Sequence, residues 1–446
     1  MTKLTPQDLL AQLLAAAKAA GADGADALYA ENVSTGVSYR LGKTEEVERS
    51  EAADLGLRVF VGQKVATVST TDMSPDSLAA LPERALTMAR LAPEDAFAHL
   101  APAEMLAKEW PELDLCDLDE PSAVTLIERA RATEEAALEV EGITNSEGGS
   151  ASYSQSHVAL ATSTGFYGSY GSSSHGISVS VLAGSGDAME RDYDFSSARF
   201  AADLDTPHNV GLRAAQRTIA RLQPRKVKSQ SVPVVFSPRA SNSLLGHFLG
   251  AISGTAIARN VSFLKDKMGQ RVFAPGVTLI DDPHIRRGLR SKPFDGEGVA
   301  NAVLKPIEDG ILTSWILDCA SARQLGLATN GRAARGTGGP PGPSATNFYM
   351  QAGAVSARKL IADIDQGLYV VELMGMGVNP VTGDYSRGAA GFWIEKGVIS
   401  YPVSEVTIAG NLIDMYASLT PASDLAFLYG IDAPTVRIEE MTVAGA

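Results

Sequence analysis

The chain has 446 residues, of which 45% are hydrophobic and 20% charged, and its formal net charge is −14. This length suits two or three domains, and the composition is that of a folded globular protein, which excludes a disordered chain. Residues 1–224 hold 17 Lys and Arg against 33 Asp and Glu, giving −16, whereas residues 225–446 hold 21 against 19, giving +2. We interpret the acidic first half as a solvated surface, and its charge argues against a nucleic-acid partner.

The N-terminal segment and the two cysteines bear on the cellular compartment in which the protein is expected to reside. Thr5-Pro6 begins an amphipathic pattern with Asp8 at the capping-box position, and no apolar core with a cleavage site precedes it. No segment reaches the roughly 20 apolar residues that span a bilayer. Cys116 and Cys319 lie far apart without a Cys-x-x-Cys pattern, which is typical of a reducing compartment. We therefore expect a cytoplasmic protein with no signal peptide and no membrane segment.

The first half of the chain has the pattern of helices mixed with antiparallel strands. Short strands are expected at 27–30, 36–41, 55–61 and 64–69, with a tight hairpin at Val61-Gly62-Gln63. Helices are expected at 74–91, 122–140 and 206–222, with irregular proline-rich chain at 92–119. Serine-rich residues 146–185 include alternating apolar positions, which favour long strands with one wet face.

A polar basic segment at 224–231 marks the predicted domain boundary. We place an N-terminal α+β domain at 1–225, with a break between two subdomains near 92–120, and a C-terminal β-rich domain at 226–446. In the second domain, Glu308-Asp309-Gly310 and Glu395-Lys396-Gly397 are predicted turns between apolar strands. The expected fold is α+β, in which the second domain has an extended, largely antiparallel sheet with one helix packed against it.

That helix follows the apolar strand 232–236 directly. Ser237 is its expected N-cap, and Pro238 takes the first helical position. Its apolar face is predicted to comprise Leu244, Leu245, Phe248, Leu249 and Ile252. Glycine recurs every four residues at 246, 250 and 254. Because glycine inside a helix costs about 1 kcal/mol relative to alanine, this stripe predicts close approach of another backbone.

No group of residues carries an activity by itself. His247 has no second ligand at helical spacing, so it is expected to be a packed or hydrogen-bonded residue. The carboxylates of Asp281-Asp282-Pro283-His284 are expected to pair with the arginines at 286 and 287 rather than bind a metal. Asp295-Gly-Glu297 is interpreted first as a turn, with paired acid/base carboxylates as the alternative. The glycine- and proline-rich segment 331–343 is expected to be irregular and to form a mobile loop over a cleft.

Several longer runs in the second half of the chain are too specific to arise by chance, and they lie at 237–254, 295–298, 318–326, 346–350, 382–395 and 405–412. These runs resemble the TldD/PmbA family of bacterial and archaeal peptidases. In the TldD kind of subunit, a leucine pair precedes a His-Glu-x-x-x-His zinc motif, and a cysteine near the C-terminus is the third ligand. Here Gly246, His247 and Ala251 hold the three motif positions, and no cysteine follows Cys319. The resemblance is therefore to the PmbA, or TldE, kind of subunit, which lacks the zinc motif.

This resemblance implies a subunit of a two-component peptidase for unfolded peptides, with zinc in a TldD-like partner and neither cofactor, metal nor catalytic residue in this chain. Family members act in the maturation of microcin-type peptides and in clearing antitoxins. We expect strand edges and the loop 331–342 to hold an extended peptide, with contacts from Gly336, Gly338, Asn347 and Tyr349. Two alternatives stay open: a self-sufficient metallopeptidase whose metal site is assembled from distant residues, and a homodimeric peptide-binding protein.

Overall fold

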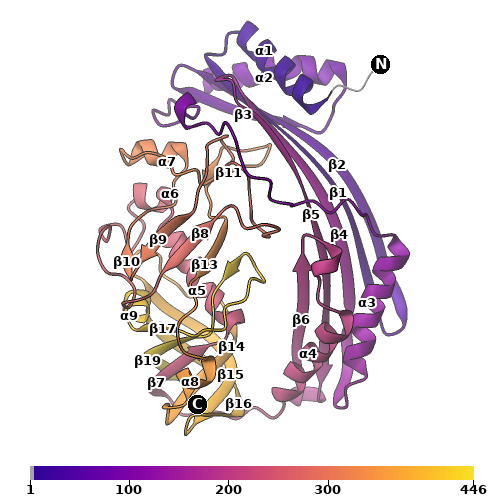
Figure 1. Cartoon of the computed structure of the whole chain (residues 1–446), viewed down its shortest axis with the longest axis vertical. Helices are drawn as coiled ribbons and strands as arrows, with labels where there is room; N and C mark the ends of the chain where they lie inside the picture. Colours follow the sequence, from indigo (N-terminus) through magenta and orange to yellow (C-terminus); the bar gives the residue numbers. More distant parts are fainter. Residues whose placement is uncertain (1–4, 446) are drawn as a thin grey trace.

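A computed structural model describes residues 5–445, and its N-terminal half is built on one long curved sheet (Figure 1). The six strands are all antiparallel and lie in the order β3-β2-β1-β4-β5-β6. Their bounds are β1 (Gly24–Arg40), β2 (Lys43–Val61), β3 (Lys64–Thr70), β4 (Ile143–Thr162), β5 (Tyr167–Ala183) and β6 (Glu190–Ala198).

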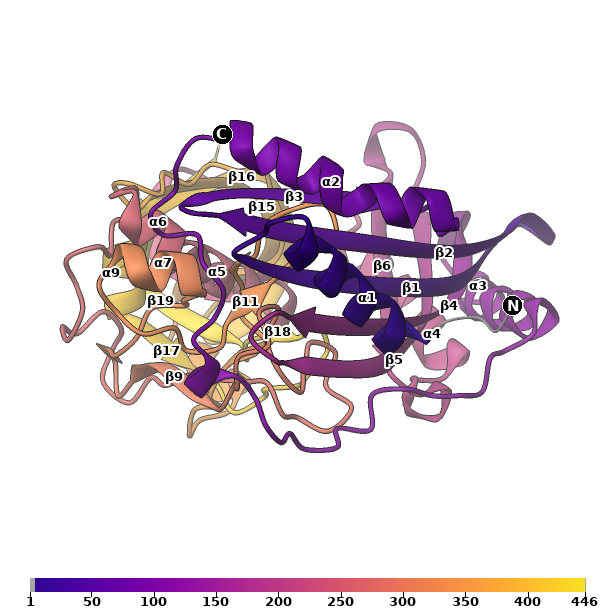
Figure 2. The same ribbon diagram turned by 90° about the horizontal axis from the view of Figure 1, so that it is seen from above.

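Four helices cover one face of this sheet in two pairs (Figure 2). They are α1 (Pro6–Ala19), α2 (Pro75–Leu91), α3 (Ala123–Leu138) and α4 (Pro207–Ala220). Each begins at a Thr or Ser whose hydroxyl accepts a hydrogen bond from the N–H three residues on. Side chains alternate between the two faces of a strand, so Ala27 under α1 and α2 and Val37 under α3 and α4 share a face of β1. The opposite face is left for the C-terminal half.

The strands of this sheet are longer than the sequence predicted. β1 runs without a break through both of its predicted pieces, 27–30 and 36–41, and ends at Arg40. β2 begins at Lys43, twelve residues before the predicted start, and residues 43–52 are all exposed. Because this part of the hairpin carries charged side chains and buries neither face, it lacks the alternation by which a half-buried strand is recognised. The predicted helices and the hairpin at Gly62 are confirmed.

The connection from α2 to α3 is irregular, as predicted, apart from a short 3-10 turn, η1 (Ala103–Met105). It runs along the sheet edge, where the backbone N–H of Ser173 donates to Leu115 O at 2.9 Å. Two further 3-10 turns are η2 (Gly186–Ala188) and η3 (Ala201–Asp203). Among the helices of residues 5–445, none combines the length and the apolar character that a membrane crossing requires.

The C-terminal half contains a sheet of order β16-β15-β14-β7-β19-β17, in which β19 also pairs with β16. This extra pairing closes five strands into a ring. Only the β14–β7 pair in it is parallel, so the largely antiparallel character is confirmed. The strands are β7 (Gln230–Phe236), β14 (Gln366–Met374), β15 (Asp384–Glu395), β16 (Val398–Asn411), β17 (Leu419–Pro421) and β19 (Val436–Ala444).

A second sheet, of order β10-β9-β8-β13-β18, shares a core with the ring. Its strands are β8 (Leu279–Asp282), β9 (Leu304–Glu308), β10 (Ile311–Leu312), β13 (Asn347–Met350) and β18 (Ile431–Asp432), and a separate pair is β11 (Ala333–Ala334) with β12 (Gly342–Pro343). The helices are α5 (Pro238–Ala251), α6 (Gly254–Ala258), α7 (Cys319–Gln324), α8 (Ala357–Ile361) and α9 (Leu412–Ala417). α5 contacts both sheets, and its Phe248 packs on Phe348 of β13.

The predicted glycine stripe does not behave as one surface. α5 ends at Ala251, and Gly254 begins the separate helix α6. A Cβ at Gly254 would collide with Ser321 Oγ and lie 2.8 Å from Leu317 Cδ2, whereas Cβ atoms at Gly246 and Gly250 would meet no atom within 4 Å. Close packing therefore occurs at Gly254, although against side-chain atoms and not the predicted backbone, and the expectation was wrong for the two glycines of α5.

The two halves meet through apolar packing and through ion pairs. Near the junction of β4 and β5, Leu160 and Phe166 pack with Phe294 of the C-terminal half. Near α4, Arg221 Nη1 lies 2.5 Å from Glu372 Oε2, and Arg239 Nη1 lies 2.6 Å from Asp192 Oδ1. The division of the chain near residue 225 stays a prediction.

Candidate functional site

The helix α5 contains Gly246, His247 and Ala251, the residues at the three zinc-motif positions. Gly246 is exposed, and Ala251 is only 4% exposed because it packs in the core. The Ala251 carbonyl accepts a hydrogen bond of 2.6 Å from Ser262 Oγ. Neither residue has a side-chain donor atom for a metal, so only His247 of the three could bind one.

His247 lies half-buried against Tyr385 of β15, with ring centroids 6.0 Å apart in an edge-to-face arrangement. Burial lowers the pKa of His247, and the nearby Arg387 guanidinium lowers it further. The imidazole is therefore neutral near pH 7. Its Nε2 makes no hydrogen bond within residues 5–445.

Metal-binding groups do not converge here or elsewhere in the described chain. Among residues 5–445, no group of three or more His, Cys, Asp or Glu side chains is arranged to hold a metal ion. A structural or catalytic zinc site requires at least three protein ligands. The residues present around α5 therefore do not fit zinc, and the absence of a cofactor from this chain stays a proposal.

A cluster of buried charges joins β1 and β2 to the C-terminal half. Asp26 accepts a hydrogen bond from Arg58 Nε at 3.0 Å and one from Arg335 Nη1 at 2.6 Å. All three side chains are at most 5% exposed. Burial acts to raise the pKa of Asp26, but the two arginines outweigh it and hold that pKa below its usual value. Asp26 is therefore an ionised carboxylate in an enclosed site.

Asp295 and Glu297 lie beside this cluster. Burial raises the pKa of Asp295 to about 7, and the Glu297 carboxylate adds to the effect. Burial also raises the pKa of Glu297, which lies 4.0 Å from Arg58. Asp295 Oδ1 accepts from the N–H groups of Glu297 and Val299, and Oδ2 accepts from Ala333. The turn interpretation of this pair is confirmed by these backbone hydrogen bonds.

The segment 331–343 is more regular than predicted. Its ends form the β11–β12 pair. Between them, Thr337 Oγ1 donates to Asp54 Oδ2 of β2, and a Cβ on Gly56 would collide with Thr337 O. The segment is therefore a short hairpin that docks on the N-terminal sheet. The absence of a side chain at Gly56 of β2 allows the backbone of the hairpin to approach the strand. Gly336 and Gly338 are both exposed at its tip.

A cavity of about 230 Å³ lies beneath this hairpin. The N-terminal sheet contributes an apolar wall that includes Leu28 and Leu160, and the C-terminal half contributes Lys292, Asp295 and Arg335. Gly336 is among the lining residues and is exposed, so the cavity reaches the surface there.

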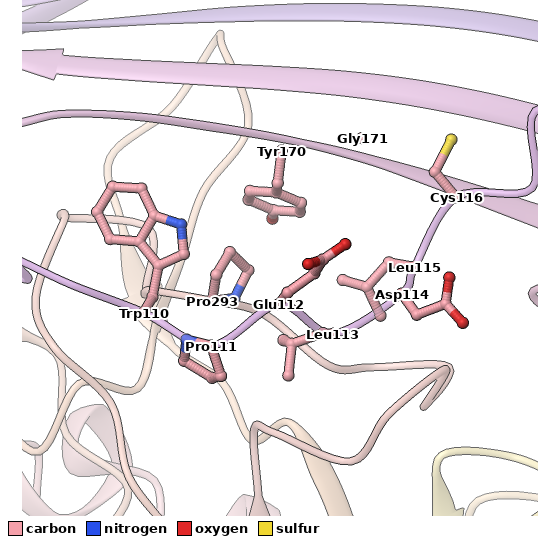
Figure 3. Close-up of a pocket in the computed structure, with 10 residues that line it drawn as sticks. All are labelled: Trp110, Pro111, Glu112, Leu113, Asp114, Leu115, Cys116, Tyr170, Gly171 and Pro293. Atoms are coloured by element: carbon pink, nitrogen blue, oxygen red, sulfur yellow. The ribbon is translucent and has the colours of Figure 1, made fainter.

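A second cavity of about 340 Å³ lies between β5 and the connection from α2 to α3 (Figure 3). Figure 3 shows the ring of Tyr170 between the side chains of Trp110 and Cys116. Tyr170 also lines the 230 Å³ cavity, so the two cavities share one wall. Gln155 Nε2 donates to Cys116 Sγ at 3.3 Å.

Asn347 and Tyr349 lie on β13, away from the hairpin tip. Asn347 is buried, and its amide donates to Asp282 O and Ser291 Oγ, both at 2.7 Å. Its oxygen accepts from Arg290 N at 2.9 Å. Tyr349 is half-buried against Phe427, with ring centroids 5.0 Å apart. Asn347 lines a different cavity from Gly336, so the four residues expected to contact a peptide do not form one surface.

The expected pairing after Asp282 was wrong in its partners. Arg286 and Arg287 both reach Asp114 of the long connection, at 2.9 and 2.7 Å. The buried Asp281 instead pairs with Arg332, at 3.3 Å. His284 Nε2 lies 2.7 Å from Asn301 Oδ1. These ion pairs join residues that are distant in sequence, so the local pattern of charges did not reveal them.

Comparisons with known proteins cover nearly the whole chain. The PmbA/TldA metallopeptidase domain 1, central domain and C-terminal domain match residues 25–89, 116–222 and 229–445. Metalloprotease PmbA of Escherichia coli O157:H7 is 40% identical over 425 residues, which are 95% of this chain and 92% of that protein. The chain belongs to the PmbA/TldD metallopeptidase family.

Two further proteins are similar to this chain. The crystal structure of TldE from Thermococcus kodakarensis superposes with a TM-score of 0.88 at 21% identity, covering 98% of this chain and 100% of that one, and so shares the fold. A metalloprotease TldD homolog of Haemophilus influenzae is 28% identical over 295 residues, 60% of this chain and 61% of that protein. Relatives of this chain therefore include proteins named PmbA and proteins named TldD homolog.

The buried charges of this family member were missed at the sequence level. Arg335 bonds Asp26, which lies 309 residues earlier, so no local pattern reveals the pair. A partial signal was present, because Asp26 and Arg58 interrupt apolar strands. Lys292 gave no signal of its own, since a lone lysine in a loop is usually solvated.

Proposed function

We propose that this chain is the TldE-type subunit of a two-subunit metalloprotease for unfolded peptides, and that it serves assembly and peptide holding without catalysing cleavage. The observation that carries the proposal is the chemistry of α5. Gly246 and Ala251 stand at the two histidine positions of the zinc motif, and neither offers a ligand atom. His247 stands at the glutamate position, and its imidazole is neutral near pH 7 because burial lowers its pKa.

The packing of α5 supports the same proposal. Ala251 lies in the core and Ser262 donates to its carbonyl. A histidine there would have to displace packed atoms, and overpacking a core costs about 1–3 kcal/mol. The packing around position 251 therefore suits alanine and not a larger side chain. In this proposal zinc belongs to the TldD-type partner, whose name appears among the relatives of this chain.

The proposed task of this chain is to complete the enclosure and to hold the substrate. The exposed hairpin tip with Gly336 and Gly338 borders a cavity between the two halves. An extended peptide at such a tip can add backbone hydrogen bonds to a strand edge. We further propose that the complex works in the cytoplasm on peptides undergoing maturation. Both cysteines, Cys116 and Cys319, are free, which is compatible with a reducing compartment.

Reconstitution tests the proposal. The purified chain, a purified TldD-type partner and their mixture are assayed for cleavage of an unfolded casein peptide, with zinc content measured for each. We expect cleavage only by the mixture, a complex on gel filtration, and zinc only in the partner. A partner whose motif glutamate is changed to glutamine is the control and abolishes cleavage. Cleavage by this chain alone, lost on chelation, would contradict the proposal and favour a self-sufficient metallopeptidase.

A further inference from the structure

The cavity beneath the hairpin 331–343 contains a buried cation with unused donors. The Arg335 side chain is 1% exposed, and its Nη1 bonds Asp26. Its Nε and Nη2 make no hydrogen bond within residues 5–445. Burying donors of a charged group without acceptors is unfavourable. Arg335 lines the cavity, so an acceptor bound there would satisfy these donors.

A second cation lines the same cavity. Lys292 lines the cavity, and its ammonium forms no ion pair within the described chain. Burial lowers the pKa of Lys292 and Arg290 lowers it further, whereas the nearby Asp295 and Asp281 act in the opposite direction. Asp295 also lines the cavity, but its two oxygens already accept three backbone N–H groups. The two cations therefore keep donors for a ligand that carries its own negative charge.

The rest of the cavity is apolar and small. Leu28, Ala30, Val158 and Leu160 of the sheet face the hairpin across it. Its volume of about 230 Å³ lies below the roughly 300–1,000 Å³ of pockets for drug-sized ligands. The space suits one short aliphatic group, and it favours a small carboxylic acid over a large polyanion.

We propose that this cavity binds a carboxylate that carries a short aliphatic group, with the carboxylate on Arg335 and Lys292 and the aliphatic group on Leu28 and Leu160. Two sources share this chemistry: the free carboxyl end of a peptide with an aliphatic last residue, and a free small acid. Assigning the peptide end as the source rests on the proposed function, whereas binding of the acid does not. The site would then hold one end of the substrate, beside the exposed tip at Gly336.

The first test compares two probes on the unaltered full-length chain. N-acetyl-leucine carries the carboxylate, and N-acetyl-leucinamide has the same shape without the charge. We expect calorimetry to show at least about tenfold tighter binding of the acid, since a hydrogen bond to a charged group is lost in the amide. Equal binding of the two probes, or no binding of the acid, would overturn the proposal, and neither result depends on how a variant folds.

Variants then locate the binding. Lys292→Met removes one cation, and Ala30→Phe fills the apolar end without changing charge. Each should weaken N-acetyl-leucine binding at least about tenfold. Lys305→Met is the matched control, because Lys305 is half-exposed and pairs with Glu308 outside the cavity. Unchanged affinity in folded Lys292→Met and Ala30→Phe would place the binding elsewhere and overturn the proposal.

A third arm separates the two sources and the two proposals. A tetrapeptide ending in leucine is compared with its C-terminal amide, in binding to this chain and in cleavage by the complex with a TldD-type partner. Tighter binding of the free-acid peptide supports the peptide end, and binding of N-acetyl-leucine alone assigns a small acid. Cleavage of both peptides at equal rates, with no acid binding, overturns this inference but leaves the proposed function standing. Acid binding without any cleavage does the reverse.

Discussion

Asp295 is a carboxyl whose burial links its protonation to folding. Burial and the neighbouring Glu297 raise its pKa to about 7, whereas in the unfolded chain it returns to the ordinary range near 3.9. The folded state therefore binds more protons than the unfolded state between about pH 4 and pH 7. Stability falls as the pH rises through this window and levels off above the folded pKa.

Replacement of Asp295 by asparagine isolates this effect. Between pH 5 and pH 8, the free energy of unfolding of the wild type should fall by about 2–3 kcal/mol relative to Asp295→Asn. Other charged groups near the site, Asp26, Arg58, Glu297, Lys292 and Arg335, are present in both proteins, so the comparison cancels most of their contribution. Urea unfolding at the two pH values measures the difference. Asp266→Asn, at an exposed carboxyl, is the control, and a pH effect of equal size in it would contradict the assignment.

At the scale of single elements, α5 and α6 differ in what their glycines do. Gly246→Ala should stabilise the chain by about 0.5–1 kcal/mol, because it removes a helix-weakening glycine where a Cβ meets no atom within 4 Å. Gly254→Ala should destabilise by about 1–3 kcal/mol, because its Cβ would collide with Ser321. Thermal unfolding of the two variants checks both signs. Stabilisation by both changes would mean that α6 does not pack on α7 as described.

Local chemistry made some elements predictable. The turns at 309–310 and 396–397 place both residues at positive φ, with Asp309 at 47° and Gly310 at 78°, as a tight hairpin requires. The predicted helices at 74–91 and 122–140 begin at Ser74 and Ser122, which cap them in the structure. By contrast, the closing of five strands into a ring depends on β19 returning to β16 and β7. The spacing of apolar residues within a strand does not reveal which other strand it pairs with. That pairing depends on packing between segments that lie far apart in the sequence.

In the candidate site too, features set by residues close in sequence were predictable, and features set by contacts between distant segments were not. The lack of metal ligands at Gly246 and Ala251 was read directly from residue types in one helix. The unpartnered donors of Arg335 were not predictable, because they follow from the docking of a hairpin onto a strand far away in the chain. The hydrogen bond from Thr337 to Asp54, 283 residues earlier, illustrates this distance. A glycine- and proline-rich composition indicated flexibility, whereas tertiary contacts hold the segment in place.

At the scale of the whole molecule, the hairpin 331–343 is one of several places where the halves are joined (Figure 1). Others are the ion pairs near α4, with Arg221 on Glu372 and Arg239 on Asp192, and the packing around Phe294. Because the hairpin covers the cavity proposed for a carboxylate, its loss should affect both the coupled unfolding of the halves and the binding of an acid.

Gly56→Val tests this coupling. Its Cβ would collide with Thr337 O, so the hairpin must leave the sheet, although valine itself suits a strand. We expect scanning calorimetry to show one transition in the wild type and two in Gly56→Val, and limited proteolysis to cut the variant within residues 335–341. Gly36→Val is the matched control, because Gly36 lies in the neighbouring strand β1 and a Cβ there meets no atom within 4 Å. A single transition in Gly56→Val would show that the other contacts between the halves, such as the ion pairs near α4 and those of Asp114, suffice to hold them together.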